Sequence, residues 1–375
     1  MQLVDLFSGE KRVDICKSLV AVFVDGPEVV VNDLVIIHAA FDFAKNLHDS
    51  IDSMSFDDER RQISRLVCKF VRKVSFGNDL EQHLNFYVDC RQAFVNLDSV
   101  KDTLVMGVLQ LVMTTYAIVH GKHSKRTIAF VKACLAYVHI TVPSIQERML
   151  RLNLFLLAGQ LSLVNGLMSQ ADTLFKTAIT LIPDMVALND VPTEEVMCNF
   201  FNSFTSALVI VPGHPEKGPF YLVVGLLNVI NEYPWAEGSA AKVRVYMNIL
   251  LLLCAYWAPK LPYHIHKMES NDVLYAKDAE YCTNLQGLVD KILEQVLSEI
   301  QATKQPSLAI DMLNRLVFSA VLNAPSAALA FELYTFAKTA TSPADQRYLK
   351  NTLAYLKRVA AAKGGLYLEL AAKLQ

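Results

Sequence analysis

His264 and His266 form a His-x-His pair with Glu269 and Asp272 close by, a residue combination that can bind a metal ion. A zinc ion needs three or four nitrogen, sulfur or oxygen ligands in a fixed geometry, and this loop offers no cysteine. We therefore interpret the two histidines as surface residues, and we predict no metal and no cofactor. Tyr263 and His264 are kept as candidates for contacts with another protein.

Catalytic motifs are missing from the sequence, which has no G-x-S-x-G, H-E-x-x-H or G-x-G-x-x-G. The acidic run Asp57–Glu59 is expected to be the charged start of a helix rather than an acid–base pair. We therefore predict a protein that is not an enzyme. The enzyme alternative is a helical transferase or lyase, and it requires His38, His48 or His83 to meet carboxylates in a closed cavity.

Four basic residues recur at helical spacing and form a stripe opposite an apolar helix face; they are Arg61, Arg65, Lys69 and Arg72. A solvated helix face is the simplest interpretation. Contact with an acidic protein surface is the alternative, for which Arg61 and Arg65 are the candidates. No aromatic residues interleave with the stripe and the formal net charge is −2, so we expect no nucleic-acid partner.

Two proline-rich loops, residues 211–219 and 258–266, join strongly apolar segments. They are expected to be rigid connectors, or else binding loops that would use His214 together with Tyr263 and His264. Trp235 lies in a turn and is a candidate anchor for a partner, or else folds back over a helix end. Trp257 closes an apolar run and is expected in the core.

Helices must position these residues, because apolar side chains recur with helical period along nearly the whole chain. Hydrophobic residues make up 53% of the sequence, and Gly and Pro are sparse, at 14 and 13. Sixteen helices are predicted. They cover residues 10–23, 30–49, 56–74, 79–95, 99–119, 124–139, 144–168, 169–182, 193–211, 217–231, 238–257, 271–302, 307–322, 326–339, 342–362 and 366–374.

Pairs of these helices recur at about 45 residues, the spacing of HEAT-like repeats. The predicted fold is all-α: a right-handed α-solenoid of antiparallel helix hairpins that forms one continuous domain over residues 1–375. We expect no transmembrane segment, because the longest apolar stretch, Leu104–Val119, is interrupted by polar residues and is shorter than the roughly 20 residues of a membrane span. The mean hydropathy of +0.29 suggests that a partner covers part of the apolar surface.

Four segments occur in the order and spacing of one known family: Arg151–Gly159, Met168–Phe175, Cys254–Trp257 and Met312–Arg315. Together they resemble helices of the large α-solenoid subunit of retromer and of its paralogue in retriever. Two further segments, residues 94–102 and 213–220, are similar to the retriever paralogue. The resemblance runs from about Asp57 to the end of the chain, so residues 1–55 lie outside it.

This resemblance implies the C-terminal half of such a subunit, because the Pro-Arg-Leu-Tyr-Pro motif of the N-terminal half is missing; the chain is expected to be a fragment or a short isoform. The family implies a non-enzymatic scaffold for endosome-to-plasma-membrane transport that cradles a small metallophosphoesterase-fold subunit. It also implies a coiled-coil and COMM-domain complex as partner and, indirectly, a sorting-nexin cargo adaptor. The implied localisation is cytoplasmic, peripheral on endosomes through these partners. The alternative is a HEAT- or TPR-like regulatory scaffold of another assembly.

Overall fold

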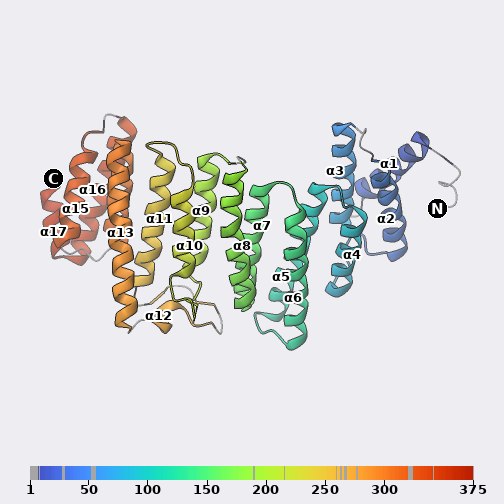
Figure 1. Ribbon diagram of the computed structural model, residues 1–375, viewed down its shortest axis with the longest axis horizontal. Coiled ribbons are helices and arrows are strands. Elements are labelled where there is room, and N and C mark those ends of the chain that lie inside the picture. Colours follow the sequence, from blue (N-terminus) through green and yellow to red (C-terminus); the bar gives the residue numbers. More distant parts are fainter. Residues whose placement is uncertain are drawn as a thin grey trace. The chain divides into compact units, whose positions relative to one another are not determined.

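The computed structural model describes residues 7, 9–27, 30–51, 56–188, 191–214, 216–258, 260–261, 264–265, 268–275, 278–319, 324–340 and 342–374, with residues 318–319, 324–325 and 363 described by their backbone alone. Within these residues there are seventeen α-helices, one 3-10 turn and no β-strand longer than an isolated bridge (Figure 1). The prediction of an all-α fold is confirmed.

The helices are labelled as in Figure 1. Their bounds are α1 Glu10–Asp25, α2 Leu34–Asp49, α3 Asp57–Lys73, α4 Leu80–Ala93, α5 Asp98–Val119, α6 Lys125–Thr141, α7 Arg148–Val164, α8 Met168–Ala187, α9 Glu194–Leu208, α10 Tyr221–Glu232, α11 Ala240–Trp257, α12 Asn271–Leu274, α13 Ala279–Thr303, α14 Pro306–Ser319, α15 Ala324–Ala337, α16 Pro343–Lys363 and α17 Leu366–Lys373.

The chain divides into two compact units, residues 1–181 and 182–375, and the boundary falls inside α8. Each unit is described here by itself. The single continuous right-handed solenoid over residues 1–375 stays a prediction.

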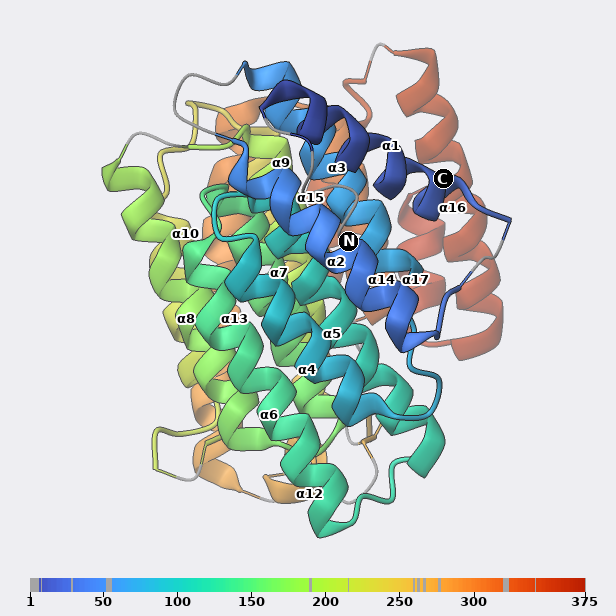
Figure 2. The same ribbon diagram turned by 90° about the vertical axis from the view of Figure 1, so that its right-hand side faces the viewer.

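The first unit is built around α5, which packs against α3, α4, α6 and α7 (Figure 2). The helix α3 shows why the periodic pattern folds in this way. Its apolar face at Ile63, Val67, Phe70 and Val71 is almost fully buried, while its opposite face carries the basic stripe. Burial of such an apolar face provides most of the stability of a surface helix. Phe70 extends this core toward α1, because its ring lies 5.6 Å from that of Phe23.

The second unit is built around α11, which packs against α9, α13 and α14. Hydrogen bonds between polar side chains link three of these helices. Asn248 of α11 donates a hydrogen bond to Asn202 of α9 over 2.5 Å, and Arg315 of α14 donates one to Asn248. Burial lowers the pKa of Arg315. The pairing is therefore needed, because a buried polar group without a partner costs free energy.

Two helix predictions are wrong by more than four residues, while the other predicted bounds lie within four residues of the observed ones. The predicted helix 271–302 is split into α12 and α13: α12 ends at Leu274, and Asp278 caps a new helix, because its side chain accepts from the backbone N–H of Glu280 over 2.9 Å. Helix α8 extends beyond its predicted end at Ile182 and continues through Pro183 to Ala187. Pro183 is exposed, whereas Met185 is only 2% exposed, so burial of the following turn supports the helix beyond the proline.

The run Arg151–Gly159 lies in α7 and is mostly buried, as its apolar composition predicts. Gly159 faces the ring of Phe175 in α8, and a Cβ atom at position 159 would lie 2.5 Å from Phe175 Cε1. Arg151 Nη2 donates a hydrogen bond to the backbone carbonyl of Gln146 over 3.2 Å, so this side chain has a structural role. Two of the family-like segments therefore meet at one close contact.

Three helical segments are long and apolar enough to cross a membrane by length and composition: Asp98–Val119, Lys125–Ser144 and Ala240–Trp257. Each buries part of its surface against other helices of its own unit. The absence of a transmembrane segment stays a prediction.

Candidate functional site

Three consecutive residues, Ser270, Asn271 and Asp272, connect the two proline-rich loops at one end of the second unit; we call them the loop brace. Asn271 Oδ1 accepts from the backbone N–H of Gly213 over 2.7 Å, and Asp272 Oδ2 accepts from that of Leu261 over 2.9 Å. All three residues of the brace are buried. The two loops, far apart in the sequence, therefore form one braced surface.

Asp272 is the electrostatic centre of the brace. Its carboxylate also accepts from Ser270 Oγ and lies 3.1 Å from His264 Nε2. Burial alone would raise the pKa of Asp272, but the hydrogen bonds from Ser270, Leu261 and His264, together with the charge of protonated His264, outweigh it and lower the pKa to about 2. The carboxylate is therefore ionised at neutral pH and holds both the loop and the histidine.

Stacked aromatic rings pack against the same region. The ring of Tyr281 lies 4.9 Å from that of Phe220 and 5.1 Å from that of Tyr275, and both pairs are stacked. Gly213 has no room for a side chain, since a Cβ atom there would lie 2.6 Å from Pro219 Cα and 3.0 Å from the Tyr275 ring. These contacts hold the first loop against Tyr275 and Tyr281.

Apolar side chains lie exposed beside the brace. Trp257, the last residue of α11, is 52% exposed, and Val273 and Leu274 of α12 are 61% and 43% exposed. The prediction that Trp257 belongs to the core is wrong. Neighbouring helices cover the preceding turn, where Leu253 is fully buried, but leave the final side chain in solvent. An exposed tryptophan at the start of a loop that the brace holds at Leu261 is suited to anchor a protein partner.

The two described loop histidines, His214 and His264, both make hydrogen bonds within this end of the second unit. His214 Nδ1 accepts from the backbone N–H of Glu216 over 3.1 Å, and its ring meets that of Tyr221 at 5.5 Å. His264 is held by Asp272, while Tyr263 and His266 lie outside the described residues. Among the described residues, no group of three or more His, Cys, Asp or Glu side chains is placed to hold a metal.

Trp235 has the folded-back arrangement. Its indole Nε1 donates to the carbonyl of Ile230 at the end of α10 over 2.8 Å, and its ring lies 4.7 Å from Tyr233 and 6.0 Å from Phe201. The side chain is half-buried. Trp235 therefore closes a helix end, while Trp257 is the more exposed of the two tryptophans.

The basic stripe lies on α3, in the first unit. Arg61 and Arg65 are both exposed there, and Arg61 Nη1 lies 3.6 Å from Asp58 Oδ1. Lys69 Nζ lies 3.7 Å from Asp25 Oδ1, so local carboxylates partly neutralise the stripe. Exposed pairs of this kind contribute little to stability. The geometry matches a solvated helix face.

A second basic segment, residues 121–126, joins α5 to α6. Ser124 Oγ accepts from the backbone N–H of Thr127 over 3.2 Å and caps α6. Arg126, in the first turn of α6, pairs with Glu81 of α4 at 2.9 Å.

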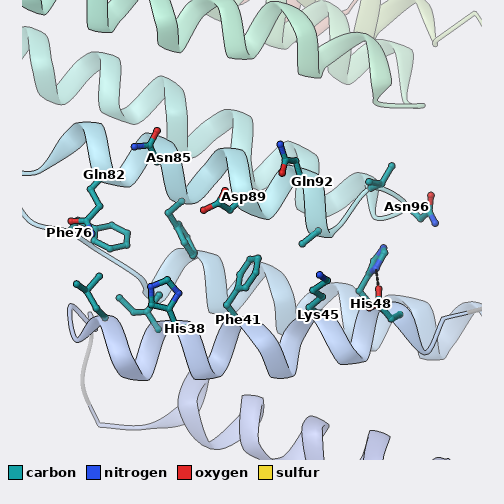
Figure 3. Close-up of a pocket in the computed structure, with 16 residues that line it drawn as sticks. His38, Phe41, Lys45, His48, Phe76, Gln82, Asn85, Asp89, Gln92 and Asn96 are labelled. Carbon is teal, nitrogen blue, oxygen red and sulfur yellow. Dashed lines mark hydrogen bonds and ion pairs between the residues drawn. The ribbon is translucent and has the colours of Figure 1, made fainter. Parts of the chain in front are cut away.

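A groove of about 780 Å³ lies between α2 and α4 of the first unit (Figure 3). It brings His38 and His48 to the same space as Asp89, and His48 Nδ1 lies 3.1 Å from Asp49 Oδ1. His38 and Asp89 are exposed, so this space is not the closed cavity that the enzyme alternative requires. His83 lies outside the groove lining. Burial lowers its pKa.

Comparison with known proteins decides the family. The family model described as the VPS35L C-terminal domain matches residues 1–375. The chain belongs to this family. A protein named "VPS35 endosomal protein sorting factor-like" from Dictyostelium discoideum is 40% identical over 97% of the chain. Its Homo sapiens counterpart, "VPS35 endosomal protein-sorting factor-like", is 37% identical over 96% of the chain. The chain spans 38% of the length of each of these relatives.

Among solved structures, a "Circular tandem repeat protein with novel repeat topology and enhanced subunit contact surfaces" is similar over 97% of this chain and 81% of its own, with 12% identity and a TM-score of 0.40. The family assignment rests on the sequence relatives and the family model.

The loop brace was missed from the sequence, although Ser-Asn-Asp is a run of residues that favour caps and turns. We predict that Asp272→Asn lowers the free energy of unfolding by about 1–2 kcal/mol at neutral pH, because one charged acceptor is lost. Urea unfolding of the purified chain measures this value. Asp290→Asn, at an exposed position of α13, is the control and is expected to change little.

The same pair of variants gives a pH test. The pKa of Asp272 is depressed in the folded state, so its contribution is present above the ordinary value of 3.8 and is lost as pH falls toward about 2. The difference between the wild type and Asp272→Asn should therefore shrink across this window. A difference that is independent of pH would contradict the role of the ionised carboxylate.

Proposed function

We propose that this chain is a non-enzymatic scaffold of an endosomal cargo-recycling complex and holds a small subunit with a metallophosphoesterase fold. The printed names of its relatives describe endosomal protein sorting factors. A sorting scaffold acts by geometry: it presents a surface on which another folded subunit buries part of its own. The sequence also lacks the common catalytic motifs.

The observation that carries this proposal is the braced loop surface of the second unit. Asn271 and Asp272 each hold one loop by its backbone, at Gly213 and at Leu261. Backbone that is already held in place loses little conformational entropy on binding. Trp257 stands exposed where the second loop begins, and large aromatic side chains are typical centres of binding energy.

The further partners of the proposed scaffold are a coiled-coil and COMM-domain complex and, indirectly, a sorting-nexin cargo adaptor. Together they would recruit the chain to the cytoplasmic side of endosomes and support return of membrane proteins to the cell surface. The motivation is the family membership and the order of the four family-like segments.

The proposal is tested by mixing the purified chain with the purified metallophosphoesterase-fold subunit and measuring the mass by size-exclusion chromatography with light scattering. We expect a stable one-to-one complex. Circular dichroism of the same sample establishes that the chain is folded. A helical, cooperatively unfolding chain that forms no complex would overturn the proposal.

A further inference from the structure

The groove between α2 and α4 has one wall of amide side chains. Gln82, Asn85, Asp89 and Gln92 line it from α4, spaced by three, four and three residues, and Asn96 lines it from the turn after that helix (Figure 3). The spacing places the four helical residues along one face of α4. Within the described part of the chain, none of these five side chains has a hydrogen-bonding partner. The wall therefore presents free donors and acceptors to whatever enters the groove.

The floor of the groove is apolar and firmly packed. Ile37 is 2% exposed and Phe86 7% exposed, and the ring of Phe86 lies 5.8 Å from that of Phe76. Phe41 also faces the groove, and its ring lies 5.8 Å from that of Phe94. A floor of packed aromatic rings suits an aliphatic or aromatic side chain.

The α2 wall carries one lysine, Lys45, together with His38, His48 and the carboxylate of Asp49. His38 and Lys45 are exposed on it, and His48 lies farther along the same helix face. Lys45 has no ion-pair partner among the described residues. This wall therefore favours an acidic side chain near Lys45, while Asp89 on the opposite wall accepts N–H donors.

We propose that this groove binds an extended peptide segment of a partner protein, independently of the surface described under Proposed function. The amides select the extended form because the backbone N–H and C=O groups of an extended chain need partners, whereas those of a helix are already bonded to each other. Gln82 and Gln92 are ten residues apart on α4, which is about 15 Å, or four to five residues of extended peptide. The peptide places an apolar side chain on the aromatic floor and an acidic one beside Lys45.

The probe is a library of random twelve-residue peptides displayed on phage, selected against the whole purified chain. The preferred sequence is then synthesised with a fluorescent label, and its Kd is measured by fluorescence anisotropy. We expect selected peptides to share an apolar and an acidic residue. Failure to select any such sequence would overturn the proposal.

The amide wall is tested with the double variant Asn85→Leu, Gln92→Leu. Asn85 and Gln92 are exposed, so the fold should tolerate the change, and the peptide should bind about tenfold more weakly for the loss of two hydrogen-bonding groups. The matched control is Gln62→Leu, Gln110→Leu, which changes two exposed amides outside the groove lining. Equal affinity of the selected peptide for the wild type and the Asn85, Gln92 variant would contradict the assignment.

The extended conformation is tested on the peptide. Methylation of single backbone nitrogens should weaken binding at alternate positions, because an extended chain directs successive N–H groups to opposite sides. Insensitivity to methylation, or helical circular dichroism of the bound peptide, would show that a helix occupies the groove and would overturn the proposal.

Discussion

Replacing Gly159 by valine is expected to lower the free energy of unfolding by about 3 kcal/mol, the upper part of the range for overpacked cores. The physical reason is the contact with Phe175, whose ring atom Cε1 would lie only 2.5 Å from the new Cβ atom. Phe175 is fully buried, so its ring has no free space to move into. Urea unfolding of the purified chain, followed by circular dichroism, measures the effect.

Gly287 provides the matched control for this prediction. It also lies inside a helix, α13, but a Cβ atom there would meet nothing within 4 Å. Gly287→Val should leave the stability within about 0.5 kcal/mol, because valine and glycine differ little in helix propensity. Equal losses at the two positions would show that the helix backbone, and not the ring contact, sets the cost.

This contact gives a physical meaning to the segment Arg151–Gly159. The glycine lets α7 approach the Phe175 ring of α8 closely, and Phe175 belongs to the next family-like segment. The residues are therefore expected to maintain the scaffold rather than to bind a partner. Gly159→Val should impair partner binding only to the extent that it unfolds the chain.

Replacing Trp257 by alanine is expected to weaken the binding of the metallophosphoesterase-fold subunit by about thirtyfold, which corresponds to a hot spot of about 2 kcal/mol. Trp257 is 52% exposed at the start of a braced loop, so its loss removes contact area without opening the core. Isothermal titration calorimetry of the purified chain with the subunit measures the Kd.

Phe56→Ala is the control for Trp257→Ala, because Phe56 is an even more exposed aromatic residue, at 81%, in the other unit. It should bind like the wild type. Both variants should keep the wild-type melting temperature to within a few degrees, as expected for exposed positions. Normal binding by Trp257→Ala would remove this tryptophan from the proposed interface.

The helical fold could be predicted because its cause is local. In α3 the apolar residues recur on one face, and the structure buries Ile63, Val67 and Phe70 completely. Helix starts were also readable, since Ser124 caps α6 with the hydrogen bond that its side chain predicts. Hydrophobic period and caps depend on neighbours within a few residues, and a sequence displays these directly.

The interaction surfaces could not be predicted in the same way, because they depend on contacts between distant residues. Gly213 and Asn271 are 58 residues apart, and no local pattern pairs them. The two tryptophans show the same limit. Trp257 ends an apolar run but is left exposed, whereas Trp235 lies in a turn but packs on Phe201. Coverage by neighbouring helices decides both environments.

Hydrogen–deuterium exchange of the purified chain, with and without the metallophosphoesterase-fold subunit, tests most directly whether the braced loop surface holds this partner. We predict slower exchange in peptides that contain Gly213, Trp257 and the loop brace, with unchanged exchange in those from α1 to α4. Protection confined to the first unit, or no change in a sample shown to contain the complex, would contradict the proposed interface.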